Sequence, residues 1–185
     1  MTFGKSLSTF SHVDRICQKT RDFFDKLAEL VNSKWGLGYK SLRVIYKGVF
    51  VPVVTYPAAG WFDRTTQYQR NKLVMAQRYA LMRIIGAYRT TSAESLTMVL
   101  GVMPIDLECA KAVAMYKVRK GIEVNIKGKI IPPRNPNIDR NTRQGKAFER
   151  AAKLAINEIM LDKWQQRWSA SEKAIVTHKY LPNVG

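Results

Sequence analysis

Apolar residues recur at steps of three and four along most of this chain, and this spacing constrains the fold more than any other feature. Such a step places the apolar side chains on one face of an α-helix. Because each helix must bury that face against another surface, we expect a mainly α fold built as a helical bundle. The pattern predicts helices over residues 12–31, 41–57, 66–86, 92–100, 104–120 and 146–169.

Residues with capping or helix-breaking chemistry mark the ends of several of these helices. Thr91-x-x-Glu94 has the spacing of a capping box, in which a hydroxyl and a carboxylate satisfy free N–H groups at a helix start. We expect Gly101 to end the short helix and Pro104 to open the next one. Pro52 should kink the second helix, because proline lacks an N–H donor and clashes with the preceding turn.

Composition divides most of the chain into three segments. Residues 12–121 contain the first five predicted helices and form the bundle. Residues 122–145 hold three prolines, four asparagines and an excess of basic residues, which is typical of a linker. Residues 146–185 supply a C-terminal helix, anchored in the core by Trp164 and Trp168, and a tail that we expect to be short and extended.

Net charge is the strongest indication of a binding partner. The sequence has 31 lysines and arginines against 14 aspartates and glutamates, a formal net charge of +17. The basic excess runs through all the predicted segments, so a folded surface should meet a polyanion, and nucleic acid is the usual one. No apolar run approaches the roughly 18 residues of a membrane-spanning helix, so no membrane partner is expected.

Metal and hydrolytic sites are not indicated by the residues that would form them. The two histidines and the two cysteines, Cys17 and Cys109, have none of the spacings of a zinc site. We expect the cysteines to be small buried side chains of a protein in a reducing compartment. There is no glycine-rich phosphate loop and no G-x-S-x-G motif. We therefore expect no cofactor in this chain and no small-molecule substrate.

A Tyr-Arg-Thr-Thr turn that begins at Tyr88 separates two apolar helical runs and carries candidate contacts to nucleic acid. Arginine binds phosphate through forked hydrogen bonds, and tyrosine contributes its hydroxyl or stacks on a sugar or base. Alternatively, these side chains form a solvated helix face, with Tyr88 packed at its boundary. The candidate nucleic-acid-binding residues are Arg78, Arg83, Tyr88, Arg89 and Thr90.

Three stretches of the sequence, in this order and spacing, resemble one family. They are WGLGYKSLRVIYKGVFVPVVTYPAAGWFD (35–63), QRYALMRIIGAYRTTSAESLTMVLGVMPIDL (77–107) and WQQRWSASEKAIVTHKYLPNV (164–184). Together they resemble the region C-terminal to the palm in reverse transcriptases of arthropod non-LTR (LINE-type) retrotransposons. Within this family, the resemblance is closest to the clade that inserts into ribosomal RNA genes.

The resemblance implies a place within a larger polymerase. Residues 12–121 would be the thumb, residues 1–11 the end of the palm, and residues 146–184 the segment that leads toward a zinc knuckle. Mg²⁺ is implied only for the parent RNA-directed DNA polymerase, because this chain has neither the Tyr/Phe-x-Asp-Asp motif nor the knuckle cysteines. We therefore expect this chain to be a thumb-like part that grips an RNA–DNA or RNA duplex. We expect it to have no polymerase activity alone and to be located inside the cell, in the nucleus.

A second hypothesis stays open beside the first. A basic helical chain of this kind also suits an RNA-binding or protein-binding module with a role in the host cell. An upstream reading frame that encodes the Asp-Asp motif of the palm would favour the retrotransposon fragment.

Overall fold

The computed structural model describes residues 9–32, 38–56, 58–126, 128–172 and 174–184, so most of the segment predicted to end the palm, residues 1–11, lies outside the described residues. Helices dominate the described part, and the predicted mainly α fold is confirmed. The elements are α1 (Thr9–Asn32), α2 (Tyr39–Ile45), the π-helical turn η1 (Tyr46–Phe50), α3 (Val51–Thr55), α4 (Ala58–Trp61), the 3₁₀ turn η2 (Phe62–Arg64), α5 (Gln67–Ile85), α6 (Ala93–Leu100), α7 (Ile105–Arg119), β1 (Val124–Ile126), β2 (Lys129–Ile131), α8 (Arg143–Ser169) and α9 (Ile175–Tyr180).

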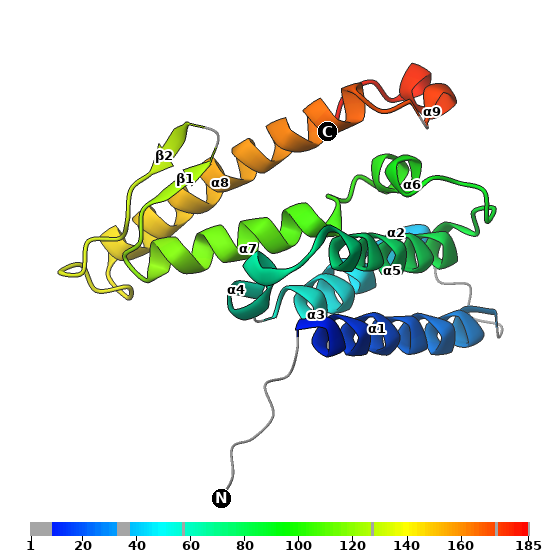
Figure 1. Cartoon of the computed structure of the whole chain (residues 1–185), viewed down its shortest axis with the longest axis horizontal. Coiled ribbons are helices and arrows are strands. Elements are labelled where there is room, and N and C mark those ends of the chain that lie inside the picture. Colours follow the sequence, from blue (N-terminus) through cyan, green and yellow to red (C-terminus); the bar gives the residue numbers. More distant parts are fainter. Residues whose placement is uncertain (1–8, 33–37, 57, 127, 173, 185) are drawn as a thin grey trace, which may run out of the picture.

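Helices α1 and α5 run parallel and side by side in the bundle (Figure 1). Two ion pairs fix their register: Lys72 Nζ lies 2.6 Å from Asp14 Oδ1, and Arg83 Nη2 lies 2.9 Å from Asp25 Oδ1. Both pairs join residues that are 58 positions apart, which requires the two helices to point in the same direction. The chain between them, α2 to η2, therefore has to return to the starting end of α1.

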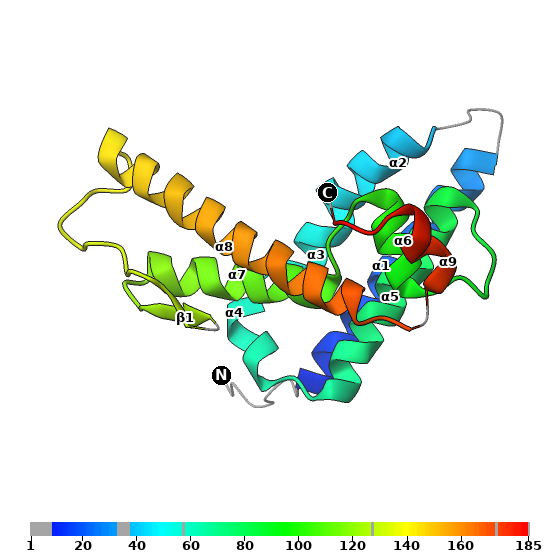
Figure 2. The ribbon, with the colours of Figure 1, turned by 90° about the horizontal axis from the view of Figure 1, so that it is seen from above.

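Buried side chains form two clusters that meet along α7. The first core lies between α1, α2, η1, α3, α5, α6 and one side of α7, and includes Val13, Phe24, Phe50, Leu81, Leu96 and Ile105. The second core lies between the other side of α7, the two strands and α8, and includes Met115, Val118, Val124, Ile131, Ile156 and Trp168. The predicted anchors Trp164 and Trp168 are both buried in this second core. In the view from above, α8 crosses α7, and its first half projects away from α1 to α6 (Figure 2).

The start of α6 differs from the prediction by one residue. Ser92, and not Thr91, caps the helix, because the Ser92 hydroxyl accepts the N–H of Ser95 at 3.0 Å. Two neighbouring hydroxyl residues offer the same capping chemistry, so only the path of the preceding turn selects between them. The predicted helix end at Gly101 is confirmed by its left-handed backbone, with a φ of 56°.

The irregularity expected at Pro52 is the π-helical turn η1, which comes immediately before α3. Proline cannot donate an N–H to the preceding turn, and a π turn is a common way for a helix to accommodate such a break. Residues on both sides of the break remain buried in the first core, among them Tyr46, Phe50 and Val54.

Part of the predicted linker, residues 122–145, is folded. β1 and β2 form an antiparallel hairpin in which Val124 pairs with Ile131, and both side chains are buried in the second core. The backbone N–H of Arg134 donates to the carbonyl of Val118, so the chain stays attached to α7 beyond the hairpin. Strands of three residues are too short to show an alternating pattern, which is why the composition alone predicted a linker.

The tail after α8 contains a short helix, α9, so the prediction of an extended piece was wrong. The backbone N–H of His178 donates to the carbonyl of Ala174 at 2.8 Å within α9. The indole N–H of Trp168 donates to the carbonyl of Leu181 at 2.8 Å, and this bond folds the tail back onto α8. No residue of α9 is buried, and polar and ring contacts hold it in place: the Thr177 hydroxyl donates to the Ser95 hydroxyl at 3.0 Å, and the His178 ring lies 5.2 Å from that of Trp168.

Candidate nucleic-acid interface

The turn that carries the predicted site connects α5 to α6 and is held from α5. Helix α5 ends at Gly86, whose φ of 63° is readily adopted only by a residue without a side chain. Arg78, two turns earlier, donates from Nε to the carbonyl of Thr91 at 2.8 Å and from Nη2 to the carbonyl of Arg89. The N–H of Thr91 donates to the carbonyl of Tyr88 at 3.0 Å and closes the turn. Arg78 therefore positions the loop, and two of its donors are already occupied.

The loop presents three of the predicted side chains to solvent. Tyr88 is 85% exposed, and Arg89 and Thr90 are exposed as well. The alternative in which Tyr88 packs at a helix boundary is therefore wrong. Within the described part of the chain, the Arg89 guanidinium has no ion pair, so its charge is available to a ligand.

Arg83 is exposed but already has partners. Its guanidinium donates from Nη2 to Asp25 Oδ1 at 2.9 Å and to the Tyr79 hydroxyl at 3.0 Å. The hydrogen bond with Tyr79 is the largest cause that raises the pKa of Arg83 above its ordinary value, and the hydrogen bond and charge of Asp25 raise it as well. The Tyr79 hydroxyl donates to the same carboxylate. Arg21 lies over the Tyr79 ring, with its guanidinium carbon 5.1 Å from the ring centroid, and adds a second cation to the same cluster.

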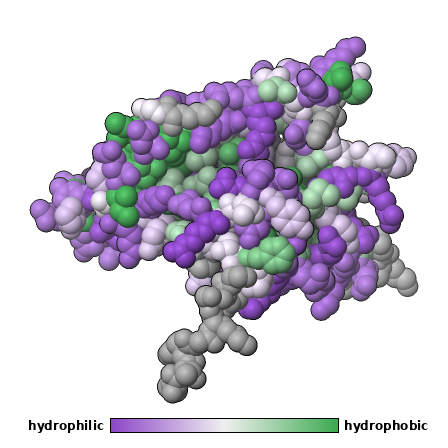
Figure 3. All heavy atoms as spheres, viewed as in Figure 1, coloured by the Kyte–Doolittle hydropathy of each residue, from purple (hydrophilic) through white to green (hydrophobic). Residues whose placement is uncertain are grey.

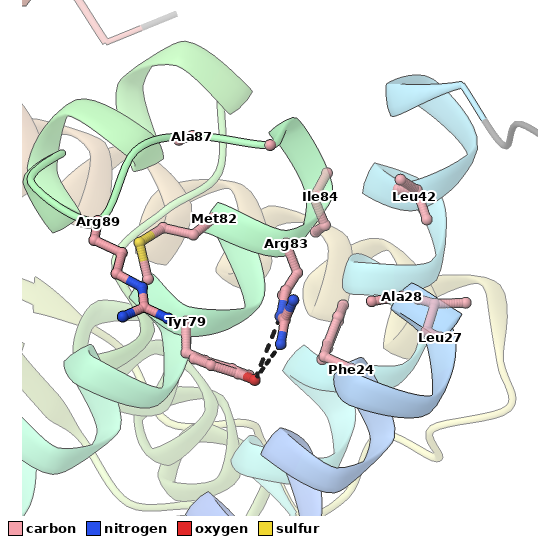
Figure 4. A pocket seen from close by; sticks show the side chains of 11 residues that line it. Phe24, Leu27, Ala28, Leu42, Tyr79, Met82, Arg83, Ile84, Ala87 and Arg89 are labelled. Atoms are coloured by element: carbon pink, nitrogen blue, oxygen red, sulfur yellow. Dashed lines mark hydrogen bonds between the residues drawn. The ribbon is translucent and has the colours of Figure 1, made fainter. Parts of the chain in front are cut away.

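Arg83 and Arg89 line one pocket of about 360 Å³, which opens between α1, α2 and α5 (Figure 4). The two guanidinium groups and the Tyr79 hydroxyl supply its polar wall. Its remaining lining is mostly apolar and consists of Phe24, Leu27, Ala28, Leu42, Met82, Ile84, Gly86 and Ala87. A second pocket, of about 550 Å³, is lined by Arg78 and Thr90 together with parts of α6 and α8. The five predicted residues therefore lie around one loop, but they do not form one pocket. Arg83 and Arg89 line the first pocket, and Arg78 and Thr90 line the second.

Sequence reasoning missed three members of this cluster. Tyr79 could have been found, because it lies four residues before Arg83 on the same helix and so shares its face. Asp25 and Arg21 come from α1, and only the parallel pairing of α1 with α5 brings them to the site. Asp25 matters most, because it neutralises part of the charge that Arg83 would offer to a phosphate.

Two other kinds of site are not found among the described residues. No three histidine, cysteine, aspartate or glutamate side chains gather there closely enough to hold a metal ion. No helix in that part of the chain is long and apolar enough to cross a membrane. Cys109 is buried and Cys17 is half-buried; burial raises the pKa of the Cys17 thiol to about 11, so the thiol form is favoured.

Relatives of this chain are Pol polyproteins of insect retrotransposons. The Retrovirus-related Pol polyprotein from type-1 retrotransposable element R1 4 of Nasonia vitripennis is 34% identical over 183 residues, which are 98% of this chain and 44% of that protein. The corresponding R1 polyprotein of Bradysia coprophila is 31% identical over 160 residues, 85% of this chain and 15% of that protein. A putative 115 kDa protein in element R1DM of Drosophila melanogaster is 25% identical over 186 residues, covering the whole chain and 17% of that protein.

These matches confirm the resemblance to non-LTR retrotransposon proteins that the sequence predicted. The chain spans less than half the length of each of these relatives. No family model matches the chain, and no solved structure does.

Proposed function

We propose that this homologue of the Pol polyproteins of insect R1 retrotransposons is a thumb-like, nucleic-acid-gripping part of a reverse transcriptase. The proposal is supported most by the loop after α5, which presents Tyr88, Arg89 and Thr90 to solvent on a chain with a net charge of +17. Its partner is an RNA–DNA or RNA duplex. The chain itself needs no cofactor for this role, and Mg²⁺ belongs to the catalytic centre of the whole polymerase. An element copied into chromosomal DNA requires a nuclear location.

The roles of the five residues in this proposal differ. Arg89 contacts phosphate directly, because its guanidinium is exposed and makes no ion pair among the described residues. Arg83 contributes a fixed but partly neutralised charge, since Asp25 accepts one of its hydrogen bonds. Arg78 holds the loop. Tyr88 and Thr90 contact the sugar or phosphate through their hydroxyl groups, or Tyr88 stacks on a terminal base.

The salt dependence of duplex binding should report these contacts. Each phosphate neutralised contributes about 0.9 to the slope of the logarithm of affinity against the logarithm of salt concentration, a B-DNA value that we apply to the hybrid. Replacing Arg83 and Arg89 together by glutamine should therefore lower that slope by roughly one to two units, because Asp25 already neutralises part of the charge of Arg83. Fluorescence anisotropy on a labelled RNA–DNA hybrid, over a series of salt concentrations, measures the slope.

Arg15→Gln with Arg64→Gln is the matched control for this experiment. Both arginines are exposed and lie toward the other end of the α1–α5 pair, so their loss should leave the slope almost unchanged. We call the protein with Arg83 and Arg89 replaced by glutamine the loop variant. If it is still folded by circular dichroism and its salt slope equals that of wild type, Arg83 and Arg89 do not belong to the interface. Binding to an acidic peptide, with no preference for duplex, would support the host-protein hypothesis instead.

The chain is expected not to polymerise DNA by itself. Two-metal phosphoryl transfer requires clustered carboxylates, and the sequence contains no adjacent pair of aspartates. Primer extension on an RNA template with Mg²⁺ or Mn²⁺ should therefore yield no product, whereas the same protein should still retain the primer–template in a binding assay. Template-dependent incorporation by pure protein would contradict the assignment to a part without catalytic machinery.

A further inference from the structure

The first half of α8 carries a second basic surface, distinct from the loop after α5. Arg143, Lys146, Arg150 and Lys153 are all exposed. They follow one another at steps of three and four residues, so they lie on one face of the helix. We refer to these four residues as the α8 basic stripe.

The helix is held so that the stripe faces away from the protein. The opposite face is buried in the second core through Ala152, Ile156 and Ile159. The start of the helix is fixed as well, because the Thr142 hydroxyl accepts the N–H of Gly145 at 3.1 Å. A side chain at Gly145 would collide with the backbone of residues 139–140, which shows how closely the preceding segment packs there. The stripe is therefore a rigid, outward-facing row of cations on the half of α8 that projects from the bundle (Figure 2).

The charge of the stripe is not neutralised within the described part of the chain. None of its four side chains makes an ion pair there. Glu149, on the same stretch of helix, is already shared by Arg119 at 3.5 Å and Arg140 at 3.1 Å. Like charges at this spacing on a helix repel one another, so the stripe weakens α8 unless a polyanion binds it.

The stripe is long enough to contact more than one phosphate of a duplex. The helix rises about 15 Å from Arg143 to Lys153, and one strand of a duplex advances about 3.4 Å along the axis per phosphate. The small side chains of Ala147 and Ala151 lie beside the cations and let a backbone approach closely. We propose that the α8 basic stripe is a second nucleic-acid-binding surface, which contacts phosphates along the backbone of a duplex. The proposal rests on the proposed function only in that both require the chain to bind nucleic acid.

A membrane surface is the other polyanion to consider. Figure 3 shows hydrophobic side chains gathered near the hairpin and α8, and Leu154, one turn from Arg150, is 71% exposed. A helix that lies in a membrane interface nevertheless inserts a broad apolar face, and the apolar face of α8 is already buried in the second core. The structure therefore favours nucleic acid over lipid for this stripe.

The test uses the whole chain with all four stripe residues replaced by glutamine. The control replaces four exposed cations elsewhere that make no ion pair in the described part of the chain, namely Arg15, Lys26, Lys47 and Arg64. Anisotropy on the same RNA–DNA hybrid should show a salt slope lower by about two to four units for the stripe variant, and by less than about one unit for the control. Glutamine is a good helix former, so circular dichroism should show α8 intact in both variants.

The outcomes separate this proposal from the proposed function. If the stripe variant keeps the wild-type salt slope while the loop variant shows a lowered slope, the stripe does not bind nucleic acid, and the proposed function still holds. If only the stripe variant shows a lowered slope, the stripe binds nucleic acid and the loop after α5 does not. Wild-type protein that does not bind the hybrid overturns both. Binding to phosphatidylserine vesicles, but not to the hybrid, with loss of vesicle binding on Leu154→Ser, would assign the stripe to a membrane instead.

Discussion

Replacing Trp168 by alanine is expected to lower the free energy of unfolding by about 3–5 kcal/mol, because a large buried side chain is lost and a cavity remains. Trp168 is 1% exposed and belongs to the second core. Its ring lies 5.2 Å from that of His178, and its indole N–H donates to the carbonyl of Leu181. The loss should therefore affect both the packing of α8 on α7 and the position of the tail.

Chemical denaturation followed by circular dichroism measures this loss. Trp168→Phe helps to separate the two effects, because it keeps much of the apolar contact but loses the hydrogen bond to Leu181; we expect it to cost about 1–2 kcal/mol. Tyr88→Ala is the control, since a side chain that is 85% exposed should change stability by no more than about 0.5 kcal/mol. A loss below about 1 kcal/mol for Trp168→Ala would mean that α8 is not packed as described.

Replacing Gln77 by leucine is expected to lower the free energy of unfolding by about 3–9 kcal/mol, because it would leave three buried polar groups without their partner, at about 1–3 kcal/mol each. Gln77 is 1% exposed. Its side-chain amide donates from Nε2 to the Tyr46 hydroxyl at 2.8 Å and to the carbonyl of Met103 at 2.9 Å, and its Oε1 accepts the N–H of Ile105 at 2.9 Å. The last bond caps α7, whose own N-cap residue, Pro104, makes no side-chain capping bond.

A double-mutant cycle tests this network against simple loss of packing. Tyr46→Phe removes the hydroxyl that needs Gln77, so the double variant with Gln77→Leu should cost less than the sum of the two single changes. Gln67→Leu, on the exposed side of the same helix, should change stability by no more than about 0.5 kcal/mol. Additive losses in the cycle, or a small loss for Gln77→Leu, would show that the buried network does not hold α5, η1 and α7 together.

The helices were predictable because their signal is local. The apolar steps of α1, α5, α7 and α8 depend only on neighbouring residues, and the predicted bounds of these helices differ from the observed ones by a few residues. Where the prediction failed, the local signal was weak or ambiguous. Two adjacent hydroxyl residues competed to cap α6, two strands of three residues showed no period, and α9 has no buried face to reveal it.

The candidate site was predictable only in part. The sequence singled out Arg83, Tyr88 and Arg89 from their charge and their place beside a turn, and the structure exposes all three. It could not reveal that Arg83 is paired with Asp25, because the two residues are 58 positions apart. Nor did the sequence reading recognise the α8 basic stripe, although its spacing was visible, because the same spacing occurs on any solvated helix face.

By itself, the sequence determined that the protein is mainly helical, strongly basic and related to R1 retrotransposon proteins, because periodicity, charge and homology are all carried by the residues in order. The tertiary structure alone decided which charges remain available. Pairing α1 with α5 occupies Arg83, and the loop carbonyls occupy Arg78. Burial of one face of α8 turns the four cations of the α8 basic stripe outward. The physical reason is that a charge is neutralised by groups within a few ångströms in space, and folding brings together groups that are far apart in the sequence.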